Sequence, residues 1–184
     1  MPDQGIEQPN TPLPYKIAVL CYLFDERGRV LLLHRVKAPN RDLFSPIGGK
    51  LEQALGESPT VCAQREIREE AGLDIDLADL HLTGIVSETA YLGETHWLMF
   101  LYEVTRPVTI APEAMRFDEG QLEWHQADAI DALPIPQTDR GVIWPLFWKH
   151  RGGFFAAHID CAAKPMRWRI EQPAAGPWQD LQPA

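Results

Sequence analysis

The sequence predicts one α/β domain of the α+β kind, in which strands and helices mix without a regular repeat. The chain has 184 residues, 45% of them hydrophobic and 23% charged, a composition typical of a globular domain that buries a full core. Runs with strand character are interspersed with two helical segments, and no internal repeat or second shift in composition marks another domain.

Composition and charge exclude several classes of protein. A net charge of −9 leaves no long basic tract, so we expect no polynucleotide partner. The longest apolar run, residues 17–24, is far short of the ~20 residues that cross a bilayer. The first fifteen residues also lack the features of a signal peptide, so we expect a cytoplasmic protein with no membrane partner. The sequence leaves a homodimer open.

The cysteines indicate neither a disulfide framework nor a zinc site. Cys21, Cys62 and Cys161 are widely separated and form no CxxC pair. We therefore expect small buried thiols in a reducing compartment.

The elements follow in chain order. Residues 1–14 form an N-terminal tail rich in proline, residues 15–163 form the domain, and residues 164–184 form a C-terminal extension anchored by Trp178. The domain is expected to begin with a β-hairpin, because two strand-like runs flank an Asp-Glu-Arg-Gly-Arg turn. The expected strands are residues 16–24, 30–35, 81–89, 97–104 and 154–159.

Two helices are expected, over Ser58 to Ala71 and Thr138 to His150. Local residues predict the boundaries of the first helix: Ser58 is a good N-cap, Pro59 suits the first helical position, and Gly72 suits a left-handed C-cap. In the second, the apolar spacing favours core positions for Trp144, Phe147 and Trp148.

The first helix carries three carboxylates on one face. Glu66, Glu69 and Glu70 fall within a sector of roughly 100°, since spacings of three and four residues return to the same side. Like charges so close destabilise a helix, and Arg65 and Arg68 offset only part of the repulsion. A hard divalent cation would offset the rest. For two glutamates alone, a solvated helix face would be the simpler interpretation.

The segment Gly49 to Leu73 resembles the signature of the Nudix hydrolases, G-x5-E-x7-R-E-U-x-E-E-x-G-U with U aliphatic. From Glu57 onward the match is complete. Upstream, seven residues instead of five separate Gly49 from Glu57, as if Ala54-Leu55 had been inserted. The resemblance implies a Nudix-type α/β/α sandwich with a mixed sheet between helices.

The resemblance also implies a MutT-like activity. Family members use Mg²⁺ or Mn²⁺ to cleave the pyrophosphate link of a nucleotide by attack of water at phosphorus. By this resemblance the metal ligands are Glu66, Glu69, Glu70 and Gly49, with Arg65 orienting Glu66 and with Glu57 as structural support.

Residues outside the helix complete the expected site. A glutamate from a later loop often acts on the metal or the water in MutT-like members, and Glu119 is the first choice, with Glu113 and Glu123 as rivals. The loop that holds Glu119 is expected just before a strand. Lys50, in a flexible glycine loop, and Arg35, at the end of the second strand, are expected to bind the substrate.

Three functions are weighed, all with a small-molecule nucleotide as partner. The C-terminal pattern is similar to that of enzymes acting on oxidised purine nucleoside triphosphates such as 8-oxo-dGTP, with Asp139 reading the purine edge or acting as a plain N-cap. Tyr91, eighteen residues past Leu73, matches a tyrosine of dinucleoside polyphosphate hydrolases, although a position in a strand is the better explanation of it. The insertion suggests a non-catalytic Nudix-fold nucleotide sensor.

Overall fold

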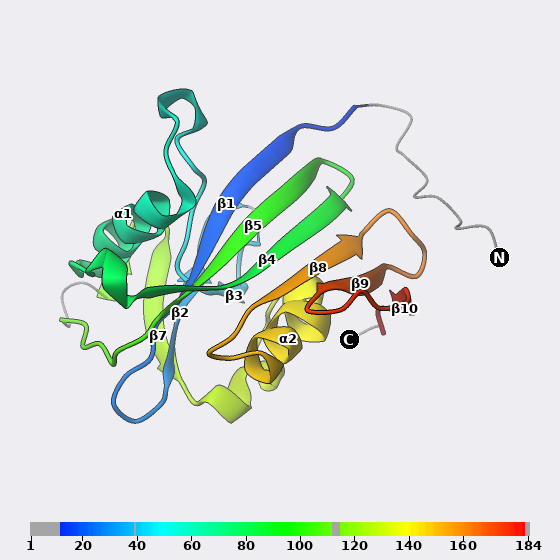
Figure 1. Cartoon of the computed structure of the whole chain (residues 1–184). Helices are drawn as coiled ribbons and strands as arrows, with labels where there is room; N and C mark the ends of the chain where they lie inside the picture. Colours follow the sequence, from blue (N-terminus) through cyan, green and yellow to red (C-terminus); the bar gives the residue numbers. More distant parts are fainter. Residues whose placement is uncertain (1–11, 39, 112–114, 183–184) are drawn as a thin grey trace.

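The computed structural model describes residues 12–38, 40–111 and 115–182, which form two sheets and a small set of helices (Figure 1). The larger sheet has six strands in the order β1-β5-β4-β8-β9-β10, and the smaller has four in the order β3-β2-β7-β6. The strands are β1 (Tyr15–Tyr22), β2 (Val30–Arg35), β3 (Phe44–Ser45), β4 (Leu80–Tyr91), β5 (Thr95–Val104), β6 (Arg116–Phe117), β7 (Gly120–His125), β8 (Phe155–Asp160), β9 (Arg167–Gln172) and β10 (Gln179–Asp180).

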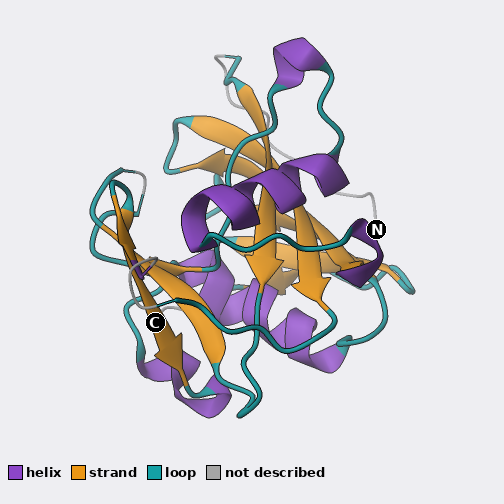
Figure 2. Cartoon of the chain, turned by 90° about the vertical axis from the view of Figure 1, so that its left-hand side faces the viewer, coloured by secondary structure: helices purple, strands orange, loops and turns teal. Residues whose placement is uncertain are grey.

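The larger sheet is mixed and lies between helices, which confirms the expected α/β/α layering. β1 pairs with β5 and β4 with β8 in parallel, whereas β4 and β5 are antiparallel. α1 covers one face and α2 the other, and Figure 2 shows α1 lying across the strands. The helical segments are α1 (Pro59–Ala71), α2 (Trp144–Lys149), the 3-10 turns η1 (Gln53–Leu55), η2 (Leu77–Asp79) and η4 (Ala127–Ala132), and the π-helical turn η5 (Asp139–Ile143).

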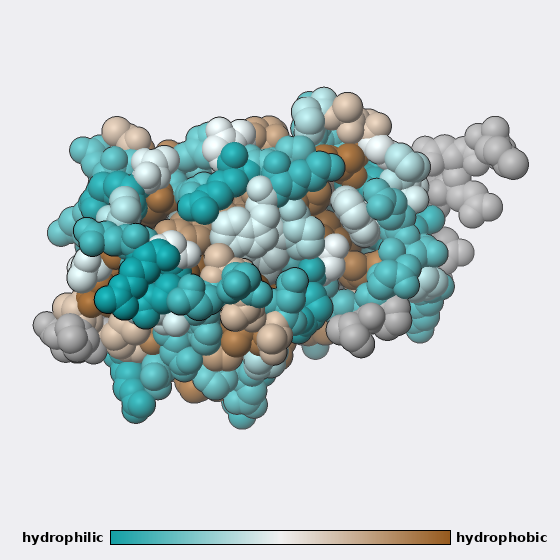
Figure 3. All heavy atoms as spheres, turned by 90° about the horizontal axis from the view of Figure 1, so that it is seen from below, coloured by the Kyte–Doolittle hydropathy of each residue, from teal (hydrophilic) through white to brown (hydrophobic). Residues whose placement is uncertain are grey.

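Two hydrophobic cores form because β1 is apolar on both faces. Val19 and Cys21 point to the core beneath α1, whereas Ala18 and Tyr22 point to the core beneath α2. Phe147 belongs to the second core, as its helical spacing predicted. Outside the cores, the face seen from below is mostly hydrophilic, with hydrophobic residues in small separate patches among the atoms that Figure 3 colours.

The capping residues of α1 behave as the sequence predicts. The Ser58 hydroxyl accepts the Val61 N–H, Pro59 occupies the first helical position, and Gly72 ends the helix in the left-handed conformation at φ 66°. The helix is therefore fixed at both ends by local chemistry, and its register relative to the sheet fixes which face its carboxylates occupy.

The expected N-terminal hairpin is wrong beyond its turn. Phe24 and Val30 form an isolated bridge around the Asp25–Arg29 turn, but β1 then joins β5 and β2 joins β7 in the other sheet. β1 is therefore the first strand of the larger sheet, whereas β2 lies between β3 and β7 in the smaller one.

The C-terminal half adds strands that periodicity did not reveal. The segment 118–124, expected just before a strand, contains the turn between β6 and β7 and most of β7 itself. Residues 164–184, expected as an extension, contribute β9 and β10 to the edge of the larger sheet. Trp178 is held as expected, with the Arg167 and Arg169 guanidinium carbons 4.7 and 4.8 Å from its ring centre. Of the cysteines, Cys21 and Cys62 are buried and Cys161 is partly exposed.

Within the described residues, no helix is both long and apolar enough to cross a membrane.

Replacing Phe147 by alanine tests the second core. Its ring is fully buried and stacks on Tyr22 with ring centres 4.1 Å apart, so Phe147→Ala should lower the free energy of unfolding by about 3–5 kcal/mol. Phe154, which is 40% exposed, is the matched control, and Phe154→Ala should cost less than about 1 kcal/mol. Urea denaturation measures both values, and equal losses would contradict this assignment of the core.

Candidate active site

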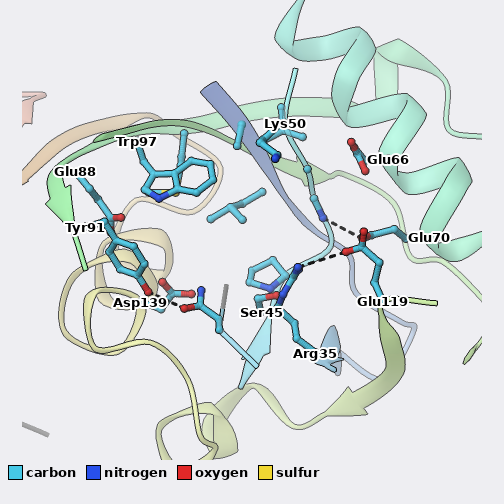
Figure 4. A pocket seen from close by; sticks show the side chains of 18 of the residues that line it. Arg35, Ser45, Lys50, Glu66, Glu70, Glu88, Tyr91, Trp97, Glu119 and Asp139 are labelled. Carbon is cyan, nitrogen blue, oxygen red and sulfur yellow. Dashed lines mark hydrogen bonds and ion pairs between the residues drawn. The ribbon is translucent and has the colours of Figure 1, made fainter. Parts of the chain in front are cut away.

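A pocket of about 450 Å³ opens beside β1 and β5 and brings together side chains from distant parts of the chain (Figure 4). At one end lie carboxylates of α1 and Glu119, and at the other lie Glu88 and Asp139. Of the residues predicted from the sequence, the pocket lining includes Arg35, Gly49, Lys50, Glu66, Glu69, Glu70, Glu119 and Asp139. Arg65 and Glu57 are not part of this lining.

Arg65 connects α1 to the loop in front of it. Its guanidinium donates to both carboxylate oxygens of Glu57, at 2.8 and 3.0 Å, and to the Glu66 carboxylate at 2.8 Å. It also donates to the Lys50 carbonyl at 3.2 Å. The hydrogen bonds from Arg65 lower the pKa of Glu57 to about 2, so this carboxylate stays ionised.

The glycine loop approaches α1 closely enough to exclude a side chain. The Val19 N–H donates to the Gly49 carbonyl at 2.9 Å, which fixes the loop against β1. A Cβ at Gly49 would overlap the Glu66 carboxylate, and one at Gly48 would overlap the Val19 carbonyl oxygen. Backbone therefore excludes a side chain at Gly48, whereas a side chain at Gly49 would require the Glu66 carboxylate to move.

The two-residue insertion does not disturb this contact. The extra length is taken up by η1, whose Leu55 is 77% exposed and which ends at Gly56 in the left-handed conformation. The two ends of this turn lie close together, because the Glu52 N–H donates to the Glu57 carboxylate at 2.8 Å. The insertion projects from the surface and leaves the loop next to Glu66 intact.

The carboxylates of α1 differ in burial. Glu66 and Glu70 are buried, whereas the Glu69 side chain is 58% exposed and bonds Arg65 at 3.2 Å. Burial raises the pKa of Glu66, and burial together with the charges of Glu66 and Glu119 raises that of Glu70 to about 8, although the Gly48 N–H donates to it. Such mutual repulsion is relieved by a cation.

This set of groups fits a hard divalent cation. The donors are carboxylate oxygens, which Mg²⁺ and Mn²⁺ prefer, and the missing Cβ at Gly49 leaves the Glu66 oxygens accessible. Among the described residues, no three acidic, histidine or cysteine side chains converge on one point. Arg65 donates to Glu66 and Glu69, and the Gly48 N–H donates to Glu70.

Glu119 reaches the carboxylate end from the β6–β7 turn. It lies 3.4 Å from the Arg35 guanidinium and acts electrostatically on both Glu66 and Glu70. Its rival Glu123 points elsewhere, toward His34 at 3.9 Å, and Glu113 lies outside the described residues. The geometry therefore favours Glu119 over Glu123.

The other end of the pocket holds a pair of buried acids. Asp139 is not the N-cap that the sequence left open; Thr138 holds that position, and Asp139 is buried in the first turn of η5. Burial raises its pKa to about 7 and that of Glu88 to about 8. Trp97 and Tyr91 lie beside the pair, and the Tyr91 hydroxyl donates to Asn40 at 2.8 Å.

Sequence reasoning missed Glu88 and gave Tyr91 too little weight. One signal was available for Glu88: it is the single acid in the inward register Val86-Glu88-Ala90 of a predicted strand. A carboxyl group at a buried position is costly unless a partner or a ligand compensates it.

Comparisons with known proteins identify the family to which the chain belongs. The NUDIX domain family matches residues 14–143. The Nudix hydrolase YvcI of Bacillus subtilis is 32% identical over 117 residues, covering 62% of this chain and 69% of YvcI. The chain therefore belongs to the Nudix hydrolase family, which confirms the enzyme class that the sequence predicted, a hydrolase of phosphoric anhydride bonds.

Two further proteins show how far the similarity extends. The MutT protein from Bacillus halodurans superposes with a TM-score of 0.63 over 91% of this chain and 99% of that one, at 24% identity, which shows a shared fold. The NAD-capped RNA hydrolase NudC of Mycobacterium tuberculosis is 38% identical over 80 residues, 44% of this chain. That match spans only 21% of NudC.

Gly49→Ala tests the contact between the loop and α1. The added methyl group would displace the Glu66 carboxylate, so we expect Mn²⁺ affinity to fall by about 10-fold or more, comparable to the loss of a group that orients a ligand. Electron spin resonance of free Mn²⁺ measures the affinity. Gln53→Ala, an exposed change in the same loop, should leave it unchanged, and equal affinities for both variants would refute the contact.

The burial of Glu88 predicts a pH dependence of stability. Its pKa is near 4.5 in the unfolded chain and about 8 in the folded one, so between these values only the folded state keeps the proton. Stability should therefore fall as pH rises from 5 to 8. Asp139 shifts in the same direction, and the Tyr91 hydroxyl and Cys161 thiol are the other titratable groups coupled to Glu88.

Glu88→Gln should remove part of this slope, because glutamine stays neutral throughout. Chemical denaturation at pH 5, 6.5 and 8 provides the measurement, and Glu94→Gln, at an exposed turn, is the control. A slope equal to that of the unmodified protein would show that Glu88 is not buried as a neutral acid.

Proposed function

We propose that this protein is a divalent-metal-dependent pyrophosphohydrolase that converts a nucleoside triphosphate to the monophosphate and pyrophosphate. One observation carries the proposal: a single pocket joins a carboxylate-rich end suited to a metal and phosphates to a buried end walled by Trp97 and Tyr91. A nucleotide has the same division between charged phosphates and a flat base. The expected setting is the cytoplasm.

The carboxylate end would hold Mg²⁺ or Mn²⁺ through Glu66, Glu69 and Glu70, with the Gly49 carbonyl as a further oxygen donor. When bound, such an ion screens the phosphate charges and lowers the pKa of a coordinated water. Arg65 keeps the Glu66 oxygens turned toward the loop, and Glu57 fixes Arg65 from the other side.

Glu119 would accept a proton from the attacking water. It sits in a tight hairpin turn, and its neighbour Arg35 sets its direction at 3.4 Å. Arg35 and Lys50 both line the pocket and carry the positive charge that phosphate oxygens need. Placing them between the two acidic ends favours phosphates in the middle of the pocket.

Asp139 would bind the base, since it is buried in the wall farthest from the carboxylates of α1. Its carboxyl group can pair with N–H groups of a purine edge. This arrangement suits a purine nucleoside triphosphate, including an oxidised one such as 8-oxo-dGTP.

A dinucleoside polyphosphate is the second candidate, and a neighbouring groove favours it. This groove, about 700 Å³ in volume, shares Asn40, Tyr91 and Thr138 with the first pocket, so a longer ligand could extend across them. A non-catalytic sensor ranks below both, because all three carboxylates of α1 are present and the insertion leaves the loop in place.

Glu70→Gln provides the decisive test. Removing one oxygen ligand should lower kcat by at least about 100-fold, the upper range for loss of a group that only orients a ligand. Product release is measured with Mg²⁺ and with Mn²⁺ over nucleoside triphosphates, 8-oxo-dGTP, dinucleoside polyphosphates and NAD-capped RNA. Glu26→Gln, exposed in the Asp25–Arg29 turn, is the control and should be unaffected.

Unchanged turnover in Glu70→Gln would refute the assigned metal site. Nucleotide binding without turnover of any of these compounds would favour the sensor.

A further inference from the structure

The C-terminal segment ends on a leucine that packs against the turn carrying Asp139. β10 pairs with β9 at the edge of the larger sheet (Figure 1), and Leu181 follows β10 directly. The Leu181 N–H donates to the Met166 carbonyl at 2.7 Å, and the residue is buried in the core beneath α2, with 4% of its surface exposed. A Cβ at Gly141 would overlap Leu181 Cδ1, so the leucine lies directly against the backbone of η5.

The sequence of η5 makes it a weak helix by itself. It is a π-helical turn, in which the Trp144 N–H donates to the Asp139 carbonyl. Pro145 follows and has no N–H, so the usual helical hydrogen bond to the Gly141 carbonyl cannot form. Glycine at position 141 also lowers helix propensity. The position of η5 therefore depends on the tertiary contacts around it.

Core packing and the C-terminal segment both supply such contacts. Val142 and Ile143 are fully buried in the core beneath α2. The C-terminal segment adds the contact of Leu181 with Gly141, and the Gln137 side-chain amide donates to the Gln182 carbonyl at 3.3 Å. Residues 181 and 182 are thus joined to the segment that begins η5 and to its middle.

This contact lies behind the wall of the pocket. Thr138 and Asp139 line the pocket, whereas Leu181 is not part of its lining. Gly141 is two residues from Asp139, which is about half a helical turn, so Leu181 presses on the side of η5 away from the Asp139 side chain. A shift of Gly141 would carry Asp139 with it, because both belong to one short turn.

We propose that Leu181 is a positioning residue of the pocket, which holds η5, and with it Thr138 and Asp139, in place without contacting the ligand. A leucine that only filled the core would stabilise the whole fold and would not act on one end of the pocket more than on the other. The proposal rests on the proposed function for the statement that the base of a nucleotide lies beside Asp139.

Leu181→Ala tests the proposal by comparing the two ends of the pocket. Isothermal titration of the full chain in Mg²⁺ uses GMP, which carries a base, and pyrophosphate, which has phosphates only. We expect the affinity for GMP to fall about 5-fold or more and that for pyrophosphate to change by less than about 2-fold. Leu181→Met, which keeps the volume, should restore the affinity for GMP. Ile75→Ala, which truncates a similarly buried side chain in the core beneath α1, is the control and should leave that affinity unchanged.

Hydrogen exchange measures the same effect without a ligand. The amides of residues 138–144 should exchange at least about 10-fold faster in Leu181→Ala, because a contact that limits local opening has been removed. Gly141→Ala tests the contact from the other side. Its methyl group requires Leu181 to move, so the affinity for GMP should fall, and combining it with Leu181→Ala should cost less than the sum of the two single changes.

Three outcomes would overturn the proposal: unchanged exchange of residues 138–144 in Leu181→Ala, equal losses of affinity for GMP and pyrophosphate, or single losses that simply add in the double variant. Circular dichroism establishes that each variant is folded, and Leu181→Val serves if Leu181→Ala is not. Failure of the proposed function is distinct, since it would appear as unchanged hydrolysis in Glu70→Gln, whereas the exchange of residues 138–144 tests the role of Leu181 independently of hydrolysis.

Discussion

The contacts between the Arg65 guanidinium and three carboxylates, those of Glu57, Glu66 and Glu69, hold the glycine loop and α1 together at one end of the pocket. Arg65 joins Glu57 at the start of α1, Glu66 on its inner face and the Lys50 carbonyl in the glycine loop. A planar fork of donors can satisfy several acceptors in fixed directions, which a lysine ammonium cannot. Because the loop is itself bonded to β1 through Gly49, one side chain sets the distance between helix, loop and sheet.

The rest of the pocket follows from how the sheets meet α1 and η5. Acids occupy both ends of the pocket: burial and the charge of Glu66 together raise the pKa of Glu70 on α1, whereas burial alone raises the pKa of Asp139 in the opposite wall. Arg35, at the end of β2, contacts Glu119 of the β6–β7 turn. On the proposed function, this alternation of charge along the pocket would give a nucleotide a single orientation in it.

The insertion before α1 shows which constraint the family signature expresses. Its first spacing is longer here, yet Gly49 and Glu66 remain in contact, since the additional residues close on themselves in η1. Two contacts are kept despite the longer spacing: the glycine backbone lies against the Glu66 carboxylate, and Arg65 donates to Glu57. The number of residues between the two points is free to vary, provided that they form a turn.

The sequence alone determined what depends on neighbours along the chain. The limits of α1 follow from Ser58, Pro59 and Gly72, and the shared face of its glutamates follows from helical geometry, so both were predictable. Two features depend instead on which partner buries each face of a strand. One is the division of β1 and β2 between two sheets, and the other is the pairing of residues 167–172 as a strand. The meeting of Glu88 with Asp139, fifty-one residues apart in sequence, was decided by tertiary structure only, because no local rule relates a strand to a distant helical turn.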